Sequence, residues 1–193
     1  MIDEETSTRL STLIPKKRLA FGLLVFERML PDLIAFSKET SFDASCYLQA
    51  KGAAWRAVQN GFIDEDLRQA CTQNIPDTEK FSHALTSYAL NAALAMDELL
   101  EYTRDNQTDH LTYVLSLARD SVDLYLTSLE QSIISSAEED KRNDDDPLME
   151  RERRQEEDDI EFLSSLPDRL DDEMLSIIKG RGSASAPLLP LSH

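Results

Sequence analysis

The stretch LAFGLLVFERMLPDLIAFSKET, residues Leu19–Thr40, decides the fold, because it is apolar for most of its length. Its apolar residues recur every three or four positions, which is the spacing of one helix face. The remaining faces are also mostly apolar, and a helix that is apolar all round is normally buried. We therefore predict a central helix in a helical bundle, kinked or restarted at Pro31.

Two adjacent charges, Glu27 and Arg28, interrupt this apolar run. At least one of them must be partly buried, and an unpaired buried charge costs several kcal/mol, so both need partners. Neighbouring side chains on a helix point about 100° apart, so we expect each charge to meet a polar group on another helix. Asn91, inside the apolar run YALNAALAM, is the candidate partner. A structural network is the favoured interpretation, and a catalytic or ligand-binding pocket is the alternative.

Further helices follow along the chain. The spacing predicts one over residues 44–60 with Gly61 as its C-terminal stop, and a short one over 64–74. Two long apolar stripes then predict an antiparallel hairpin over 81–137, with a cap at Asp77 or Thr78. With a further helix capped by Asp146, we predict an all-α fold, a compact multi-helix bundle of about seven or eight helices.

The late part of the chain is strongly acidic. Residues 138–173 hold 17 acidic and 6 basic residues, which is −11 of the formal net charge of −17. We expect one all-helical domain over 1–181 and a disordered C-terminal tail over 182–193, because that tail is rich in Pro, Ser and Ala. The acidic helix is interpreted as a solvated outer helix. The alternative is an acidic interaction face formed by four consecutive residues: Glu156, Glu157, Asp158 and Asp159.

Composition argues against several functions. The negative charge disfavours direct binding of nucleic acid or of anionic membranes, although mimicry of nucleic acid is a further alternative. Cys46 and Cys71 have no zinc spacing and no disulfide framework, and we interpret them as reduced thiols in the cytoplasm. No histidine has Glu three residues before it, as a di-iron bundle would need, and no phosphate-binding or nucleophile motif occurs. We therefore assign no catalytic, cofactor-binding or metal-binding residue.

The segment FERMLPDLIAFSKETSFD resembles a signature of the YjaG-like family of uncharacterised bacterial proteins. The matching residues are Glu27, Arg28, Met29, Pro31, Phe36, Thr40 and Phe42. IPDTEKF and DPLMERERRQEED also resemble later segments of that family. The resemblance implies an all-α fold, a bacterial cytoplasmic setting and self-association, and it implies no activity. Relatives tend to carry Asp near the position of Asn91, and a hydrogen-bonding role survives that change while a catalytic carboxylate does not.

These observations together predict a non-enzymatic interaction or regulatory protein with a protein partner at its acidic helix, and a homo-oligomer as a further possibility. The alternative is a small-molecule- or metal-binding bundle, or an enzyme, with its pocket around Glu27 and Arg28.

Overall fold

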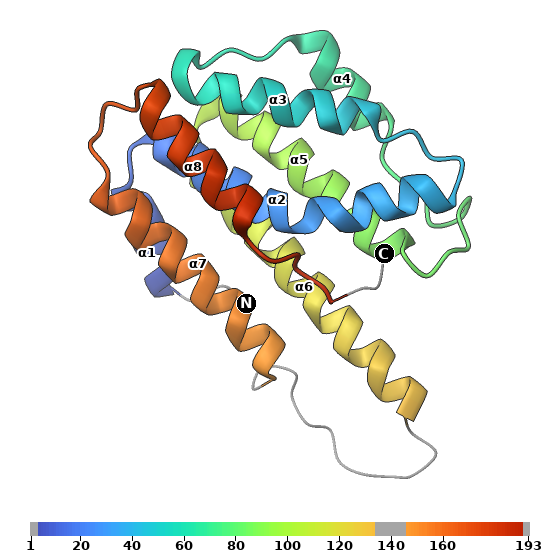
Figure 1. The fold of residues 1–193 in the computed structure, drawn as a ribbon. Coiled ribbons are helices and arrows are strands. Elements are labelled where there is room, and N and C mark those ends of the chain that lie inside the picture. Colours follow the sequence, from blue (N-terminus) through green and yellow to red (C-terminus); the bar gives the residue numbers. More distant parts are fainter. Residues whose placement is uncertain (1–3, 134–145, 191–193) are drawn as a thin grey trace.

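The computed structural model describes residues 4–133 and 146–190, and within these residues it contains eight α-helices and no strand (Figure 1). The prediction of an all-α bundle is confirmed. The helices are α1 (Glu4–Thr12), α2 (Pro15–Glu39), α3 (Ser45–Asn60), α4 (Glu65–Gln73), α5 (Thr86–Asp105), α6 (Thr108–Ile133), α7 (Pro147–Ser165) and α8 (Asp172–Ala184). None of the helices in these ranges combines the length and the apolar character that crossing a membrane requires.

Helix α2 lies at the centre of the bundle and contacts α3, α5, α6, α7 and α8. It continues through Pro31 as one helix, so the expected restart at that residue is wrong. Close packing explains its glycine, because a Cβ atom added at Gly22 would collide with the side chains of Leu99 and Leu111 on α5 and α6. The missing side chain therefore lets the α5–α6 hairpin approach α2 closely.

The α5–α6 hairpin begins later than predicted, at Thr86 instead of Phe81. Asp77 caps a separate turn through a hydrogen bond from the Glu79 backbone N–H at 2.9 Å, so it does not start α5. Phe81 packs edge-on against Phe36 of α2, with 5.2 Å between ring centroids. Residues 134–137, the expected end of the hairpin, lie outside the described residues.

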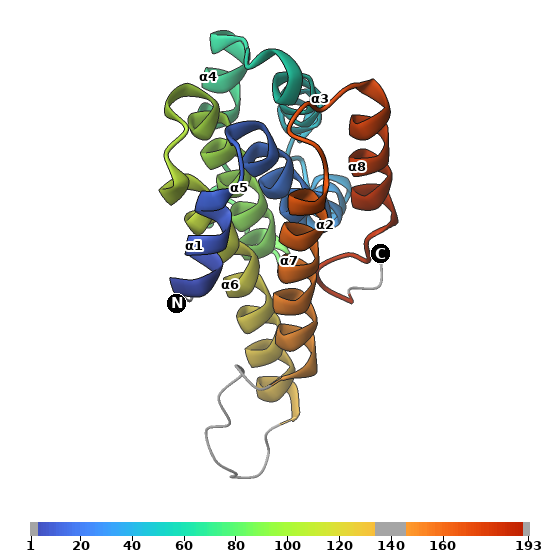
Figure 2. The same ribbon diagram turned by 90° about the vertical axis from the view of Figure 1, so that its left-hand side faces the viewer.

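Helices α1 and α7 cover the side of the bundle shown in Figure 2, where both lie beside α6. Helix α1 was not predicted. Helix α7 begins as expected, since Asp146 accepts a hydrogen bond from the Leu148 backbone N–H at 2.7 Å and Pro147 occupies the first turn. Residues 138–145 of the acidic segment lie outside the described residues.

The C-terminal residues correct the predicted tail. Helix α8 continues to Ala184, and residues 185–190, which we call the strap, follow it (Figure 1) and are hydrogen-bonded to Arg28 of α2 and Arg151 of α7. Leu188 and Leu189 are buried in the core, and the Leu188 N–H donates to the Arg28 carbonyl oxygen at 2.8 Å. A tail that buries two leucines is packed, so the disorder predicted from residue 182 is wrong for 182–190; residues 191–193 lie outside the described residues.

Candidate functional site

Arg28 lies at the centre of a buried ion network. Its side chain is almost completely buried, on the face of α2 that contacts α7. Nη2 donates to Glu152 Oε1 at 2.6 Å and Nε donates to Glu152 Oε2 at 3.1 Å, while Nη1 donates to Asp159 Oδ2 at 2.8 Å. Burial alone would lower the pKa of Arg28, but the Glu152 and Asp159 carboxylates raise it above its usual value. Arg28 is therefore held in its charged form.

Asp159 extends the network from α2 to α8. Its side chain is fully buried, and its second oxygen, Oδ1, accepts from Arg181 Nε at 2.6 Å and from Gln155 Nε2 at 3.1 Å. The Arg181 guanidinium also lies over the Phe162 ring, 4.8 Å from its centroid. One carboxylate of α7 thus joins α2 to α8.

Glu156 forms a second branch of the network, toward α6. Arg119 Nη2 donates to Glu156 Oε2 at 2.5 Å and Nε donates to Oε1 at 3.2 Å, so the pair is bidentate. Burial raises the pKa of Glu156 to about 7, and the Arg119 hydrogen bond opposes that rise. We call the six residues the α7 ion network: Arg28, Arg119, Glu152, Glu156, Asp159 and Arg181. It holds three arginines and three carboxyl groups.

Glu27 faces a different neighbour. Its carboxylate accepts from Lys51 Nζ and from Trp55 Nε1 on α3, both at 3.1 Å. Asn91 contacts neither Glu27 nor Arg28, so the expected partnership is wrong. It lies on the face of α5 that meets α6 and donates from Nδ2 to Ser121 Oγ at 3.0 Å. The three candidate residues therefore lie in three separate interfaces.

The four consecutive acids of α7 do not share one exposed face. Glu157 and Asp158 are exposed, whereas Glu156 and Asp159 are each at most 1% exposed and belong to the α7 ion network. Side chains on a helix repeat every 3.6 residues, so consecutive residues must point to different sides. The expectation of a solvated outer helix is wrong for this inner face, and the four-residue interaction face is reduced to its two exposed members.

Glu152, Arg119 and Arg181 were not among the residues predicted from the sequence. A signal for Glu152 was present, because positions 152, 156 and 159 have the i, i+4, i+7 spacing of one helix face. They share that face with three buried apolar residues of α7: Met149, Ile160 and Leu163. The two arginines had no comparable signal, since only the fold brings them to α7.

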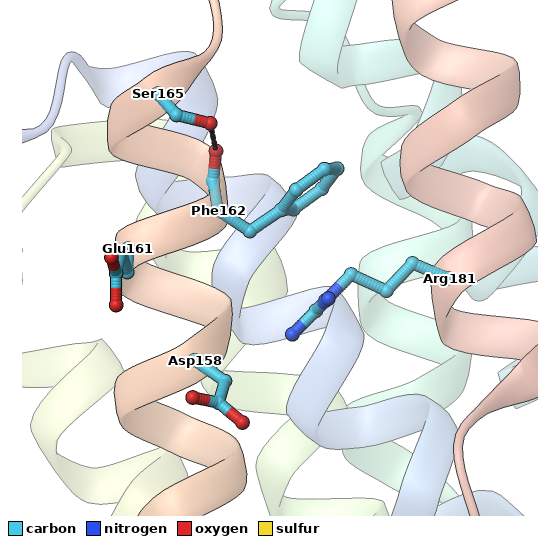
Figure 3. A pocket seen from close by; sticks show the side chains of 5 residues that line it. All are labelled: Asp158, Glu161, Phe162, Ser165 and Arg181. Atoms are coloured by element: carbon cyan, nitrogen blue, oxygen red, sulfur yellow. Dashed lines mark hydrogen bonds between the residues drawn. The ribbon is translucent and has the colours of Figure 1, made fainter.

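A shallow groove, which we call the α7–α8 groove, adjoins the network on the outside (Figure 3). It consists of two pockets of about 340 Å³ each, and Arg181 lines both of them. Asp158, Glu161, Phe162 and Ser165 line the first, and in Figure 3 the Arg181 guanidinium extends toward these α7 side chains. Asp158 borders both pockets, and residues 184–186 line the second. The groove is thus an open surface with acidic and aromatic walls.

Within residues 4–133 and 146–190, no cluster of three or more His, Cys, Asp or Glu side chains is placed to hold a metal ion.

The fold is similar to that of a protein of known structure. The crystal structure of a DUF416 family protein from Shewanella baltica is similar to this structure, with a TM-score of 0.78 and 18% sequence identity. The similarity covers 94% of this chain and 96% of that protein, and at this identity it concerns the fold alone. No curated protein matches the sequence. A family profile described as "Protein of unknown function (DUF416)" matches residues 5–182, and the chain therefore belongs to the DUF416 family.

Proposed function

We propose that the protein is a non-enzymatic interaction protein that binds a basic segment of a partner protein in the α7–α8 groove. The observation that carries this proposal is the pair of exposed carboxylates, Asp158 and Glu161, on the wall of a groove that also presents an aromatic ring. Within the described residues neither carboxylate takes part in an ion pair. Both are therefore available to a cation from outside.

The chemistry of the groove fits a lysine or arginine side chain. The carboxylates supply charge, and the half-buried Phe162 ring, over which Arg181 already lies, adds apolar surface at its exposed part for the aliphatic stem of such a side chain. The formal net charge of −17 also favours encounter with a basic partner. These features support a protein partner more than a nucleic acid, whose phosphates the same charge repels.

A non-enzymatic role is supported by the state of the buried charges. Glu152, Glu156 and Asp159 each accept from an arginine, so none of them is left as a base facing a substrate. The alternative of a pocket around Glu27 and Arg28 has less support. Arg28 is 3% exposed, and its Nε, Nη1 and Nη2 atoms all donate to groups inside the protein.

The finer assignments remain predictions. The resemblance at residues 26–43 favours a YjaG-like bacterial protein of the cytoplasm, and self-association is a further prediction from the same likeness.

The test measures binding of a fluorescein-labelled peptide with four arginines by fluorescence anisotropy at low salt. We expect the double variant Asp158→Asn/Glu161→Gln to bind at least tenfold more weakly than the unchanged protein and to keep its melting temperature. The matched control, Glu79→Gln/Asp120→Asn, removes two exposed acids from other parts of the surface. Equal weakening in both variants would mean that binding follows net charge alone, and the proposal would fail.

A second pair of variants tests whether Glu156 and Asp159 are buried while Glu157 and Asp158 are exposed. Glu156→Gln/Asp159→Asn leaves Arg119, Arg28 and Arg181 with weakened or neutral partners inside the bundle, so we expect a large fall in melting temperature. Glu157→Gln/Asp158→Asn changes the same net charge outside the bundle and should leave the melting temperature within a few degrees. Reversed effects would contradict the burial on which the proposed groove depends.

A further inference from the structure

The fold brings the two cysteines of the chain together. Cys46 lies in the first turn of α3 and Cys71 in the last turn of α4, two helices that pack against each other (Figure 1). Asn74, which lies three residues after Cys71, contacts the Cys46 sulfur at 3.4 Å, so the two cysteines lie at one junction between the helices. Cys71 is completely buried, whereas Cys46 is partly exposed.

Hydrogen bonds around the two cysteines fasten the helix ends in this arrangement. The Tyr47 hydroxyl donates to the carbonyl oxygens of Cys71 at 3.1 Å and of Asn74 at 2.9 Å. The Asn74 side-chain amide donates to the Asp43 carbonyl oxygen at 2.7 Å and to the Cys46 sulfur at 3.4 Å. The start of α3 and the end of α4 are thus held together by several hydrogen bonds, and only one of these bonds involves a sulfur atom.

We propose that Cys46 and Cys71 form a peroxide-sensitive thiol pair that closes to an intramolecular disulfide. The proposal is independent of the α7–α8 groove. Its basis is the placement of a partly exposed and a buried thiol at one helix junction, where Tyr47 bonds to the Cys71 carbonyl and Asn74 to the Cys46 sulfur. In the reduced form that the structure shows, both cysteines are free thiols. Closure requires the sulfurs to approach to about 2.05 Å.

The two thiols differ in reactivity. Hydrogen bonds from the Cys71 thiol, the Asn74 amide and the Tyr47 backbone N–H lower the pKa of Cys46, against the effect of its partial burial. The pKa of Cys71 is raised, because its proton is donated to Cys46 and because it is buried. The thiolate is the reactive form of cysteine, so Cys46 reacts first.

The oxidation balances with hydrogen peroxide as the only oxidant. The Cys46 thiolate attacks one peroxide oxygen, an S–O bond forms, the O–O bond breaks, and the departing hydroxide takes a proton and leaves as water. The Cys71 sulfur then attacks the Cys46 sulfenic acid, an S–S bond forms, the S–O bond breaks, and a second water leaves with the Cys71 proton. One peroxide is reduced while two thiols are oxidised, and a dithiol reductant reverses the change.

The first experiment treats the reduced full chain with a small excess of hydrogen peroxide and then alkylates free thiols in denaturant. We expect the intact protein to lose two hydrogen atoms, to resist alkylation and to yield one linked pair of tryptic peptides, residues 39–51 and 69–80. Dithiothreitol should restore two alkylatable thiols. Two free thiols after oxidation, or a disulfide between two protein molecules, would overturn the proposal.

Single variants separate the roles of the two sulfurs. Cys71→Ala should stop at a sulfenic acid on Cys46, trapped by dimedone, whereas Cys46→Ala should leave Cys71 unmodified in the folded protein. Dimedone labelling of Cys71 in the Cys46→Ala variant would contradict the assigned order.

The role of Asn74 is tested by the pH dependence of Cys46 alkylation by iodoacetamide. Asn74→Ala removes a donor to the sulfur and should shift the rate profile to higher pH. The control Gln73→Ala alters an exposed neighbour at the same helix end and should leave the profile in place. Identical profiles for both variants would remove Asn74 from the site.

Discussion

Arg28 of α2 and Asp159 of α7 form a completely buried ion pair, with 2.8 Å between Nη1 and Oδ2. Removing one partner of a buried pair leaves the other charge without compensation. For Arg28→Met we therefore expect a loss of about 3–5 kcal/mol in the free energy of unfolding, measured by urea denaturation. Arg154→Met is the matched control, since Arg154 is exposed and pairs with an exposed Glu150, and it should cost about 1 kcal/mol or less. Similar small losses in both variants would show that the network contributes little.

The strap makes its own contribution to stability. Leu188 is completely buried, and Leu→Ala at such a position costs about 2–5 kcal/mol. We expect Leu188→Ala to lower the free energy of unfolding by an amount in that range. Ile177→Ala on α8 is the control, because Ile177 is 46% exposed and its truncation should change little. An equally small change at Leu188 would mean that the strap is not packed in solution.

The stability of the protein should depend on pH through Asp32. This carboxyl group is 2% exposed on α2, and burial raises its pKa to about 7 from 3.8. A folded chain with the higher pKa binds more protons than the unfolded chain, so stability is greatest at low pH and falls as pH rises between the two values. For Asp32 this fall amounts to on the order of 4 kcal/mol.

Asp32→Asn should remove that part of the pH dependence. Urea denaturation from pH 4.5 to 8 should give a flatter curve for the variant and a more stable protein at pH 8. The pKa of Glu156 is shifted in the same direction, but Glu156 is present in both proteins. The difference between the two curves is therefore the contribution of Asp32. Parallel curves would contradict the raised pKa.

Two glycines should respond to alanine in opposite directions. Gly22 has the side chains of Leu99 and Leu111 in the space of a Cβ atom, so Gly22→Ala should cost about 1–3 kcal/mol through overpacking. Gly180 on α8 has nothing within 4 Å of that position, so Gly180→Ala should stabilise the helix by about 0.5–1 kcal/mol. Calorimetric melting of both variants checks the contrast, and stabilisation by Gly22→Ala would be evidence against the close approach of α5 and α6.

The sequence was most informative where local signals are strong. Periodicity identified the buried α2, Gly61 marked the end of α3 through its left-handed conformation, and Asp146 with Pro147 marked the start of α7. These features depend on residues within one or two helical turns of each other.

Features that depend on distant residues were not predictable in this way. Helix α1 is short and mostly polar, and only its packing against α6 and α7 buries Leu10. The inner acids of α7 look solvated until Arg28, Arg119 and Arg181 are placed beside them. Likewise, the Pro- and Ser-rich composition of the strap predicts disorder, and the burial of its two leucines depends on contacts with distant residues.

The position of Arg28 near the start of the chain affects how the protein is made. During synthesis on the ribosome, Arg28 emerges 124 residues before Glu152 and 131 residues before Asp159. Until α7 has been translated, α2 must leave its guanidinium in water, although the apolar residues around it favour collapse. We therefore expect the contacts of α2 with α7 to form last, when nearly the whole chain is available.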